Sequence, residues 1–232
     1  MLRIATRKSP LALWQAEFVK SRLEHFYPEL KIELVKMTTQ GDKILDTPLS
    51  KIGGKNLFIK ELEIGMMEGR ADIAVHSMKD VPTILPEGII QAAVLKRANN
   101  SDIIVLKDTE EFFGLKEATI ATGSLRRKAM WLNRFPTHTV VDLRGNVNTR
   151  LNKLRDNDWD GAIFAAAGLE RIGKRPGGAV NLSWMISAPA QGAIMITSLN
   201  EDDYIKDACE QLNHFETEVC VSVERDFLHR LE

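Results

Sequence analysis

Hydrophobic positions along the chain follow two spacings that alternate from one end to the other. Short apolar runs, typical of buried strands, are separated by longer segments in which apolar residues recur every three or four positions, as on one face of a helix. The predicted strands are residues 2–6, 31–37, 72–75, 90–95, 103–106, 118–121, 139–142, 162–165 and 194–198. The predicted helices are residues 10–27, 57–69, 125–132, 147–154, 201–212 and 216–231. This alternation predicts an α/β protein with largely parallel strands.

The predicted elements fall into two blocks, one before and one after about residue 96. In both blocks a strand repeatedly runs into a polar or basic segment and then into a helix. The late strand at 194–198 would return to the first block, so the chain would cross between the blocks twice, near residues 95–100 and 188–193. We therefore expect two α/β domains whose strand ends face a shared cleft, because open α/β sheets bind ligands at the carboxyl ends of their strands.

Local signals indicate where several elements begin. Ser9 followed by Pro10 is typical of a helix start, with the serine side chain as N-cap and proline at the first helical position. Ser124 is a second predicted N-cap. Residues 38–49 are polar and predict a loop whose turn lies at residues 41–42.

Composition excludes several classes of protein. The chain has 232 residues, of which 44% are hydrophobic and 27% charged, as expected for one or two globular domains. A net charge of -1 argues against nucleic-acid binding, and no apolar run approaches the length of a membrane span. The N-terminus lacks a signal-peptide core, so a cytoplasmic protein is expected. Cys209 and Cys220 have no metal-binding spacing and the histidines are scattered, so no metal site is predicted.

The most informative stretch runs from Asp72 to Asp80. Residues 72–75 are predicted to be a buried strand, and Ser77, Lys79 and Asp80 follow its end. A carboxylate held beside a cation stays ionised and can stabilise positive charge that develops in a reaction. The alternative is an ordinary polar junction between a strand and a loop. The rest of the chain favours the first interpretation, because basic residues follow other predicted strands in the same way.

Basic residues gather at the predicted strand ends, in adjoining loops and in the first turns of the helices that follow. They are Arg7, Lys51, Lys55, Lys79, Arg126, Arg127, Arg144, Arg150 and Arg171. Guanidinium groups match carboxylates and phosphates with two parallel hydrogen bonds, and a helix N-terminus adds positive potential. Any one of these residues also fits a solvated surface charge, but the whole set predicts a cationic cleft for a small polyanion. Aromatic residues make up only 6% of the chain, which argues against single-stranded nucleic acid.

Several of these segments are parts of longer motifs. They are Arg7-Lys8-Ser9-Pro10-Leu11-Ala12-Leu13-Trp14-Gln15, Gly53-Gly54-Lys55, Ala74-Val75-His76-Ser77-Met78-Lys79-Asp80, Ser124-Leu125-Arg126-Arg127, Leu143-Arg144-Gly145-Asn146, Ala167-Gly168-Leu169 and Pro189-Ala190-Gln191-Gly192. With these motifs, which are spread over the whole chain, the sequence resembles the porphobilinogen deaminase (hydroxymethylbilane synthase) family. The resemblance implies a transferase of haem biosynthesis that joins four porphobilinogen molecules head to tail into hydroxymethylbilane, with loss of ammonia. The acetate and propionate groups of each pyrrole would account for a cationic cleft.

The resemblance also implies a fold. It predicts an α/β protein with two lobes like those of type II periplasmic binding proteins, each on a mixed five-stranded sheet. Domain 1 would comprise residues 1–95 and 192–211, domain 2 residues 96–191, and residues 212–232 would begin a third α/β domain. A monomer that binds porphobilinogen, with no nucleic-acid or membrane partner, is expected.

By the same resemblance, Asp80 is the catalytic carboxylate. It would hold pyrrole N–H groups and stabilise the cationic pyrrole that forms when ammonia leaves. The implied cofactor is a dipyrromethane attached by a thioether to a cysteine, on which the product chain grows. The residues implied in binding the carboxylates of cofactor and substrate are Arg7, Ser9, Lys55, Ser77, Lys79, Thr122, Ser124, Arg126, Arg127, Arg144, Arg150 and Arg171.

Two features depart from the family pattern. Gly123 stands where the family usually has a serine, so one hydroxyl is lost. The family's cofactor cysteine follows an Arg-Leu-Glu-Gly-Gly segment, whereas this chain stops at Glu232, and neither Cys209 nor Cys220 matches that position. We therefore expect the 232-residue chain to be inactive. The helix at 216–231 would be poorly anchored, with its apolar stripe partly exposed.

A receptor for a small dicarboxylate or a phosphorylated metabolite, with two lobes and no chemistry, is the alternative that the fold and the arginines alone permit. Asp80 separates the two hypotheses, because a carboxylate in an anion-binding cleft repels the ligand unless the chemistry needs it. A nucleic-acid-binding protein is disfavoured by the net charge of -1.

Overall fold

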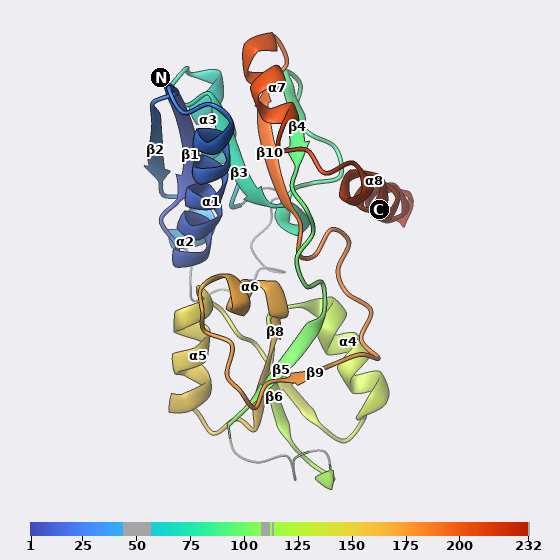
Figure 1. Ribbon diagram of the computed structural model, residues 1–232. Helices are drawn as coiled ribbons and strands as arrows, with labels where there is room; N and C mark the ends of the chain where they lie inside the picture. Colours follow the sequence, from blue (N-terminus) through green and yellow to red (C-terminus); the bar gives the residue numbers. More distant parts are fainter. Residues whose placement is uncertain (44–56, 108–111, 113, 232) are drawn as a thin grey trace. The chain divides into compact units, whose positions relative to one another are not determined.

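The computed structural model describes residues 1–43, 57–107, 112 and 114–231 (Figure 1). These residues form two compact units, each built on its own five-stranded sheet. The first unit holds the described residues up to Ala98 and those from Pro189 onward, and the second holds those from Asn99 to Ala188. Two separate mixed sheets confirm the predicted α/β class.

The first sheet has the strand order β2-β1-β3-β10-β4. Its strands are β1 (Leu2–Arg7), β2 (Ile32–Met37), β3 (Ile73–Ser77), β4 (Ile89–Val94) and β10 (Ile194–Leu199). Strands β1, β2 and β3 are parallel, whereas β10 runs antiparallel to its neighbours β3 and β4. The late strand therefore returns to the first block as its sequence predicts, and it places Ile194 opposite Ser77 at the carboxyl end of β3.

Four helices of the first unit agree with the sequence pattern, and two short ones were not predicted. They are α1 (Pro10–Phe26), α2 (Gln40–Lys43), α3 (Lys60–Met67), the short 3-10 helix η1 (Met78–Asp80), α7 (Asp203–Glu210) and α8 (Phe215–Leu231). The Ser9 hydroxyl accepts a hydrogen bond from the Ala12 amide, which confirms the predicted N-cap. The turn predicted at residues 41–42 is wrong, because one turn of helix forms there, and the Asp42 carboxylate accepts hydrogen bonds from the Thr39 amide and hydroxyl.

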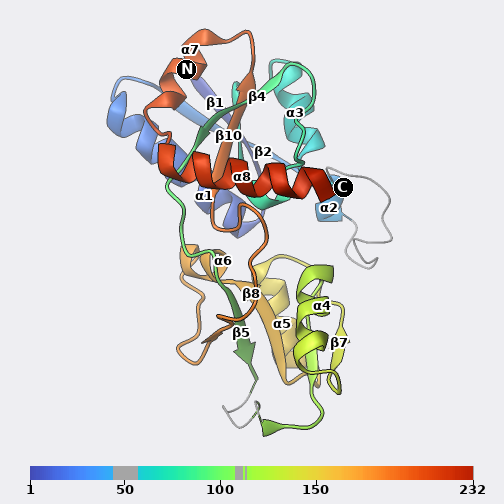
Figure 2. The same ribbon diagram turned by 90° about the vertical axis from the view of Figure 1, so that its right-hand side faces the viewer.

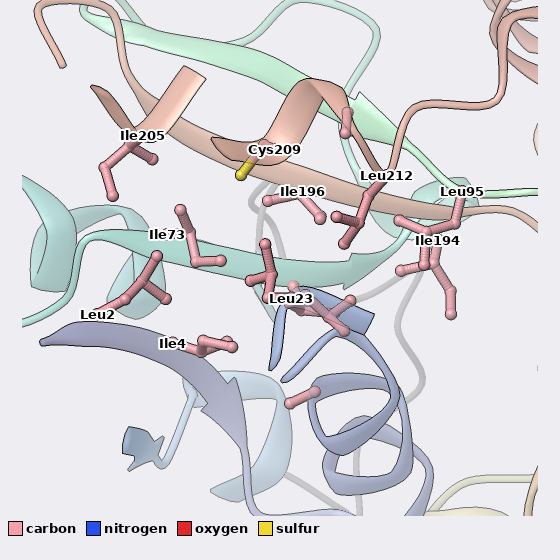
Figure 3. Packing of buried hydrophobic residues seen from close by; sticks show 14 residues of the cluster. Leu2, Ile4, Leu23, Ile73, Leu95, Ile194, Ile196, Ile205, Cys209 and Leu212 are labelled. Carbon is pink, nitrogen blue, oxygen red and sulfur yellow. The ribbon is translucent and has the colours of Figure 1, made fainter. Parts of the chain in front are cut away.

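Helices cover both faces of the first sheet, because successive strand residues point to opposite sides. On one side, Ile4 packs in a cluster with Leu23 of α1 and Cys209 of α7 (Figure 3). On the other side, the next residue, Ala5, packs with Leu62 of α3. Burial raises the pKa of the Cys209 thiol to about 12, so this cysteine is an inert core residue at neutral pH.

A substitution of Leu23 tests this packing of α1 against the sheet. We expect Leu23→Ala to lower the free energy of unfolding by about 3 kcal/mol, because the side chain is fully buried between α1 and the sheet and its removal leaves a cavity. Leu125→Ala is the matched control, since the Leu125 side chain is 70% exposed and should lose less than about 0.5 kcal/mol. Urea unfolding of both variants measures the difference, and equal losses would contradict the assigned core.

The second sheet has the strand order β7-β6-β8-β5-β9. Its strands are β5 (Asp102–Leu106), β6 (Thr119–Ala121), β7 (Thr139–Val141), β8 (Gly161–Ala165) and β9 (Val180–Asn181), and its helices are α4 (Leu125–Arg134), α5 (Val147–Asp156) and α6 (Ala166–Arg171). Strands β6, β7 and β8 are parallel, whereas β5 runs antiparallel to β8. Phe164 packs with Leu154 of α5 on one face, and Ile163 packs with the buried Trp131 of α4 on the other. The Ser124 hydroxyl accepts a hydrogen bond from the Arg127 amide, which confirms the second predicted N-cap.

The last helix, α8, belongs to the first unit, and Figure 2 shows it in red beside that unit's strands. The expectation of poor anchoring is wrong, because Val221 is fully buried and Glu224 forms an ion pair with Arg97. The stripe predicted to be exposed is exposed; its members are Val219, Val223, Phe227 and Leu231. A third domain that begins at residue 212 stays a prediction. Among the described helices, none has the length and apolar character needed to cross a bilayer.

Candidate active site

The first unit places several of the predicted site residues at one edge of its sheet. Strands β1 and β3 are parallel, so Arg7 and Ser77 lie at their carboxyl ends, and Lys79 and Asp80 follow in η1. The segment that leads into β10 reaches the same edge, where Gln191 Oε1 accepts a hydrogen bond from Lys79 Nζ at 3.2 Å. This is the edge at which α/β sheets bind ligands.

Asp80 ends the short helix η1 and exposes its side chain. The turn is closed by a hydrogen bond from the Val81 amide to the Met78 carbonyl at 3.1 Å, and the Met78 side chain is buried in the core. Within the described part of the chain, no hydrogen bond or ion pair engages the Asp80 carboxylate. A carboxylate on an anchored turn is therefore available to a bound cation or N–H donor.

Arg7, by contrast, already has an anionic partner. Its guanidinium forms a two-bonded pair with the Asp42 carboxylate, and its Cζ lies 4.2 Å from the centre of the Phe58 ring. Burial alone would raise the pKa of Asp42, but hydrogen bonds from Arg7 and Thr39 outweigh it and hold that pKa below its ordinary value. The pair fixes Arg7 in place, and a ligand carboxylate would have to share the Arg7 guanidinium with Asp42.

The hydroxyl groups predicted at this edge also have protein partners. Ser77 Oγ lies 2.9 Å from Gln15 Nε2 and donates to Gln15 Oε1 at 3.2 Å. Ser9 Oγ caps α1 and is therefore engaged by its own helix. Lys55, also predicted to bind carboxylates, lies outside the described residues.

His76, within β3, gives this edge a measurable pH dependence. Burial, with the nearby charge of Arg7, lowers its pKa to about 4, and its Nε2 lies 3.0 Å from Thr197 Oγ1. Between about pH 6.5 and pH 4 the unfolded chain binds a proton that the folded chain does not, so stability falls as the pH falls through this window. From pH 7 to pH 5 we expect the free energy of unfolding to drop by about 2 kcal/mol more in the unmutated protein than in His76→Gln. The control His25→Gln, at an exposed site, should behave like the unmutated protein in urea unfolding at both pH values.

The second unit gathers its candidates at the equivalent edge of its own sheet. Strands β6, β7 and β8 end there and β5 begins there, because Asp102 pairs with Ala165 in the antiparallel register. The candidates that follow these strand ends are Thr122, Ser124, Arg126, Arg127, Arg144, Arg150 and Arg171. These residues therefore follow strand ends at one edge of this unit's sheet, as the sequence predicts, whereas their role in binding a ligand and a cleft shared with the first unit stay predictions.

A buried carboxylate, Asp102, holds the two arginines at the start of α4. Its Oδ1 accepts hydrogen bonds from Arg127 Nε at 3.0 Å and Nη2 at 2.7 Å, and its Oδ2 lies 2.7 Å from Arg126 Nη2. Arg127 also donates to the Ile163 carbonyl at 3.1 Å and is itself buried. Arg126 is partly exposed and donates to the Ile186 carbonyl. One carboxylate between two guanidinium groups gives these three side chains together a net positive charge.

The loop between β7 and α5 carries two further arginines. Gly145 has a φ of 113°, and a Cβ there would lie 2.7 Å from the Thr149 side chain, so the turn requires glycine. Arg150 Nε donates to the Gly145 carbonyl at 2.7 Å. Burial lowers the pKa of Arg144, and it lowers the pKa of Arg171 to about 10. Both groups stay charged at neutral pH, and a bound anion would offset the unfavourable burial of their charge.

Three polar residues that were not predicted from the sequence hold the predicted ones in place. They are Asp102, which pairs with two arginines, Asp42, which pairs with Arg7, and Gln191, which binds Lys79. Asp102 directly precedes the apolar run at 103–106, and a carboxylate in a buried strand requires a cation beside it. The position of Asp102 therefore indicates that it pairs with a cation. Nothing in the sequence pattern connects Asp42 with Arg7.

The sequence of the chain is similar to those of known proteins. A sequence model of the family described as "Porphobilinogen deaminase, dipyromethane cofactor binding domain" matches residues 2–207. The porphobilinogen deaminase of Dichelobacter nodosus is 50% identical over 234 residues, an alignment that covers 100% of this chain and 76% of that protein. The chain belongs to the porphobilinogen deaminase family. The chloroplastic porphobilinogen deaminase of Euglena gracilis is 46% identical over 240 residues, covering 99% of this chain and 50% of that protein.

Solved structures of low sequence identity share the fold of this porphobilinogen deaminase family member. The methionine-binding protein MetQ matches with a TM-score of 0.56 at 11% identity, over 97% of this chain and 96% of that chain. The VFT2 domain of Bordetella pertussis BvgS matches with a TM-score of 0.52 at 12% identity, over 96% and 92%. The effector-binding domain of BenM matches with a TM-score of 0.52 at 14% identity, over 93% and 92%. These matches confirm the predicted likeness to periplasmic binding proteins.

Proposed function

We propose that the protein condenses four porphobilinogen molecules head to tail into hydroxymethylbilane and releases ammonia. The observation that carries this proposal is the exposed Asp80 carboxylate, held on η1 beside Lys79 at the carboxyl ends of β1 and β3. An anion-binding edge gains nothing from an unpaired carboxylate, whereas a reaction that develops positive charge does. Membership of the porphobilinogen deaminase family supplies the substrate class.

Asp80 would act on the pyrrole ring of the substrate. Its carboxylate can accept hydrogen bonds from pyrrole N–H groups and stabilise the positive charge that spreads over the ring as the C–N bond to ammonia breaks. Lys79, whose Nζ is held by Gln191, would bind a substrate carboxylate rather than neutralise Asp80. The charge of Asp80 then stays available for the reacting ring.

Dipyrromethane, when bound, would supply the pyrrole carbon to which the first substrate is joined. The residues present fit such a group, because the two arginines at the start of α4 and Asp102 together carry a net positive charge and the guanidinium of Arg144 is buried at the same edge. The side chains that we propose to bind its carboxylates and those of the substrate are Arg7, Ser9, Lys55, Ser77, Lys79, Thr122, Ser124, Arg126, Arg144, Arg150 and Arg171. Arg127 was predicted to bind them too; we propose that it acts through its pair with Asp102 and orients Arg126. That a cysteine anchors the dipyrromethane is part of this proposal.

The alternative function is a small-anion binding protein without catalysis. The fold is compatible with it, since one of the solved structures of similar fold is a methionine-binding protein. The two functions differ in what happens to the ligand, because a binding protein returns porphobilinogen unchanged. We also propose a monomeric, cytoplasmic protein, which sedimentation of the purified protein and fractionation of the source cells would test.

Turnover of porphobilinogen tests the proposed function. The protein encoded by the full-length gene should be used, because the relatives extend beyond the region that this chain covers. Incubation with porphobilinogen should release ammonia and, after oxidation, give porphyrin absorbance. Binding without either product would support the alternative. The 232-residue polypeptide, assayed in parallel, tests the expectation of inactivity drawn from its sequence.

A further inference from the structure

The helix α8 turns its buried side toward the segment that carries Asp80. Val221, in the middle of the helix, is fully buried and packs in one cluster with Met78 and Val81. These two residues flank Lys79 and Asp80 in the chain. The hydrophobic part of the α8 contact therefore supports the two ends of η1 and leaves the two charged side chains exposed.

One turn further along the same side, Arg225 binds the backbone that follows Asp80. Its Nη1 donates to the Val81 carbonyl at 2.9 Å, and its Nη2 donates to the Pro82 carbonyl. A guanidinium is planar and its donors are fixed relative to one another, so binding two successive carbonyls fixes the orientation of both peptide planes. These two peptides, Val81–Pro82 and Pro82–Thr83, directly follow the peptide that joins Asp80 to Val81, so holding them restrains the turn that carries the Asp80 side chain.

The residue before it, Glu224, holds the other segment at this edge. Its carboxylate binds Arg97 through two hydrogen bonds of 2.5 and 2.9 Å and accepts the Ala190 amide at 2.7 Å. Burial alone would raise the pKa of Glu224, but these hydrogen bonds hold it below its ordinary value. Arg97 also donates to the carbonyl of Gln191, whose side chain binds Lys79. Two adjacent residues of α8 thus hold the backbones that present Asp80 and support Lys79.

We propose that Arg225 is a positioning residue for Asp80 in the reaction. The helix α8 would then contribute to catalysis although none of its side chains need touch the substrate. The inference rests on the proposed role of Asp80. Arg225 is suited to it because the two hydrogen bonds described for it go to backbone carbonyls, which orient the turn without adding a competing partner to the Asp80 carboxylate.

Amide hydrogen exchange of the 232-residue chain tests the local part of this proposal. Arg225→Gln should speed exchange of the Val81 amide, which donates to the Met78 carbonyl and closes η1, by about 10-fold. The matched control is Arg230→Gln, since Arg230 lies on the same helix but pairs only with exposed Asp226 among the contacts described for it. Unchanged exchange over residues 78–82 in Arg225→Gln would overturn the proposal. A general increase over all of α8 would do so too, because it would make the role merely structural.

Kinetics of the full-length protein test the catalytic part. Arg225→Gln should lower kcat by about 10-fold and leave KM within about twofold, because substrate is still bound but the carboxylate is misdirected. Arg225→Lys, which can donate to one carbonyl but not to both in fixed geometry, should recover part of the loss. A higher KM with unchanged kcat would overturn the proposal in favour of direct ligand binding. If the unmutated protein fails to consume porphobilinogen, the proposed function fails, and the exchange experiment still decides whether Arg225 orders the Asp80 turn.

Discussion

Asp80→Asn in the full-length protein is expected to lower kcat by about 10²-fold or more. The substitution keeps the size of the side chain and removes only its negative charge. No described group is bonded to the Asp80 carboxylate, so its loss leaves no protein cation unpaired and should not disturb η1. The fold and any bound dipyrromethane should therefore be retained. Rates of porphobilinogen consumption, together with the urea midpoint of unfolding, measure both expectations.

The control for this variant is Glu87→Gln, which removes an exposed carboxylate from the loop that follows η1. It should change kcat by less than about twofold, because surface charges far from reacting atoms are screened by solvent. Near-normal turnover in Asp80→Asn would remove Asp80 from the mechanism. A loss of turnover with an equal loss of stability would also count against it, because the residue would then be structural.

The second large effect is expected at Asp102, the buried carboxylate between two arginines. Asp102→Asn should lower the free energy of unfolding of the second unit by about 3–5 kcal/mol. The reason is that the amide cannot neutralise the Arg127 guanidinium, which is buried and donates two hydrogen bonds to the carboxylate in the unmutated protein. Trp131, Trp159 and Trp184 all lie in this unit, so tryptophan fluorescence in urea reports its unfolding.

Asp156→Asn is the matched control for Asp102. Its carboxylate pairs with Arg155 at 3.0 Å, but both side chains are exposed, so the pair should contribute less than about 1 kcal/mol. If Asp102→Asn is as stable as this control, Asp102 does not compensate a buried cation. In the full-length protein Asp102→Asn should also weaken substrate binding, because Arg126 loses the partner that orients it.

The sequence predicted those parts of the structure that depend on local pattern. The caps at Ser9 and Ser124 and the return of β10 to the first sheet follow from apolar spacing and short polar signals. So does the strand predicted at residues 72–75, which the structure places at Ile73–Ser77. The candidate residues gather at sheet edges for the same reason, because parallel strands end at a common edge. The two-residue strand β9 escaped prediction because it is too short to show any periodicity.

Contacts between distant residues could not be predicted in the same way. Arg7 and Asp42 are separated by 35 positions and Arg127 and Asp102 by 25, and no local pattern pairs them. The sequence predicted that Arg127 binds the ligand, whereas in the folded chain Arg127 binds the buried carboxylate of Asp102. The anchoring of α8 was missed for a related reason, because Glu224 and Arg225 resemble solvated helix charges until Arg97 and the backbone at Val81 are seen beside them.

The most direct test of the proposed reaction is the intact mass of the full-length protein before and after mixing with a small excess of porphobilinogen. We predict a resting mass above that of the polypeptide by one dipyrromethane, and further species heavier by whole pyrrole units after mixing. In Asp80→Asn the resting mass should be the same and the heavier species should be nearly absent. A protein that keeps the mass of its bare polypeptide and returns porphobilinogen unchanged would contradict the account.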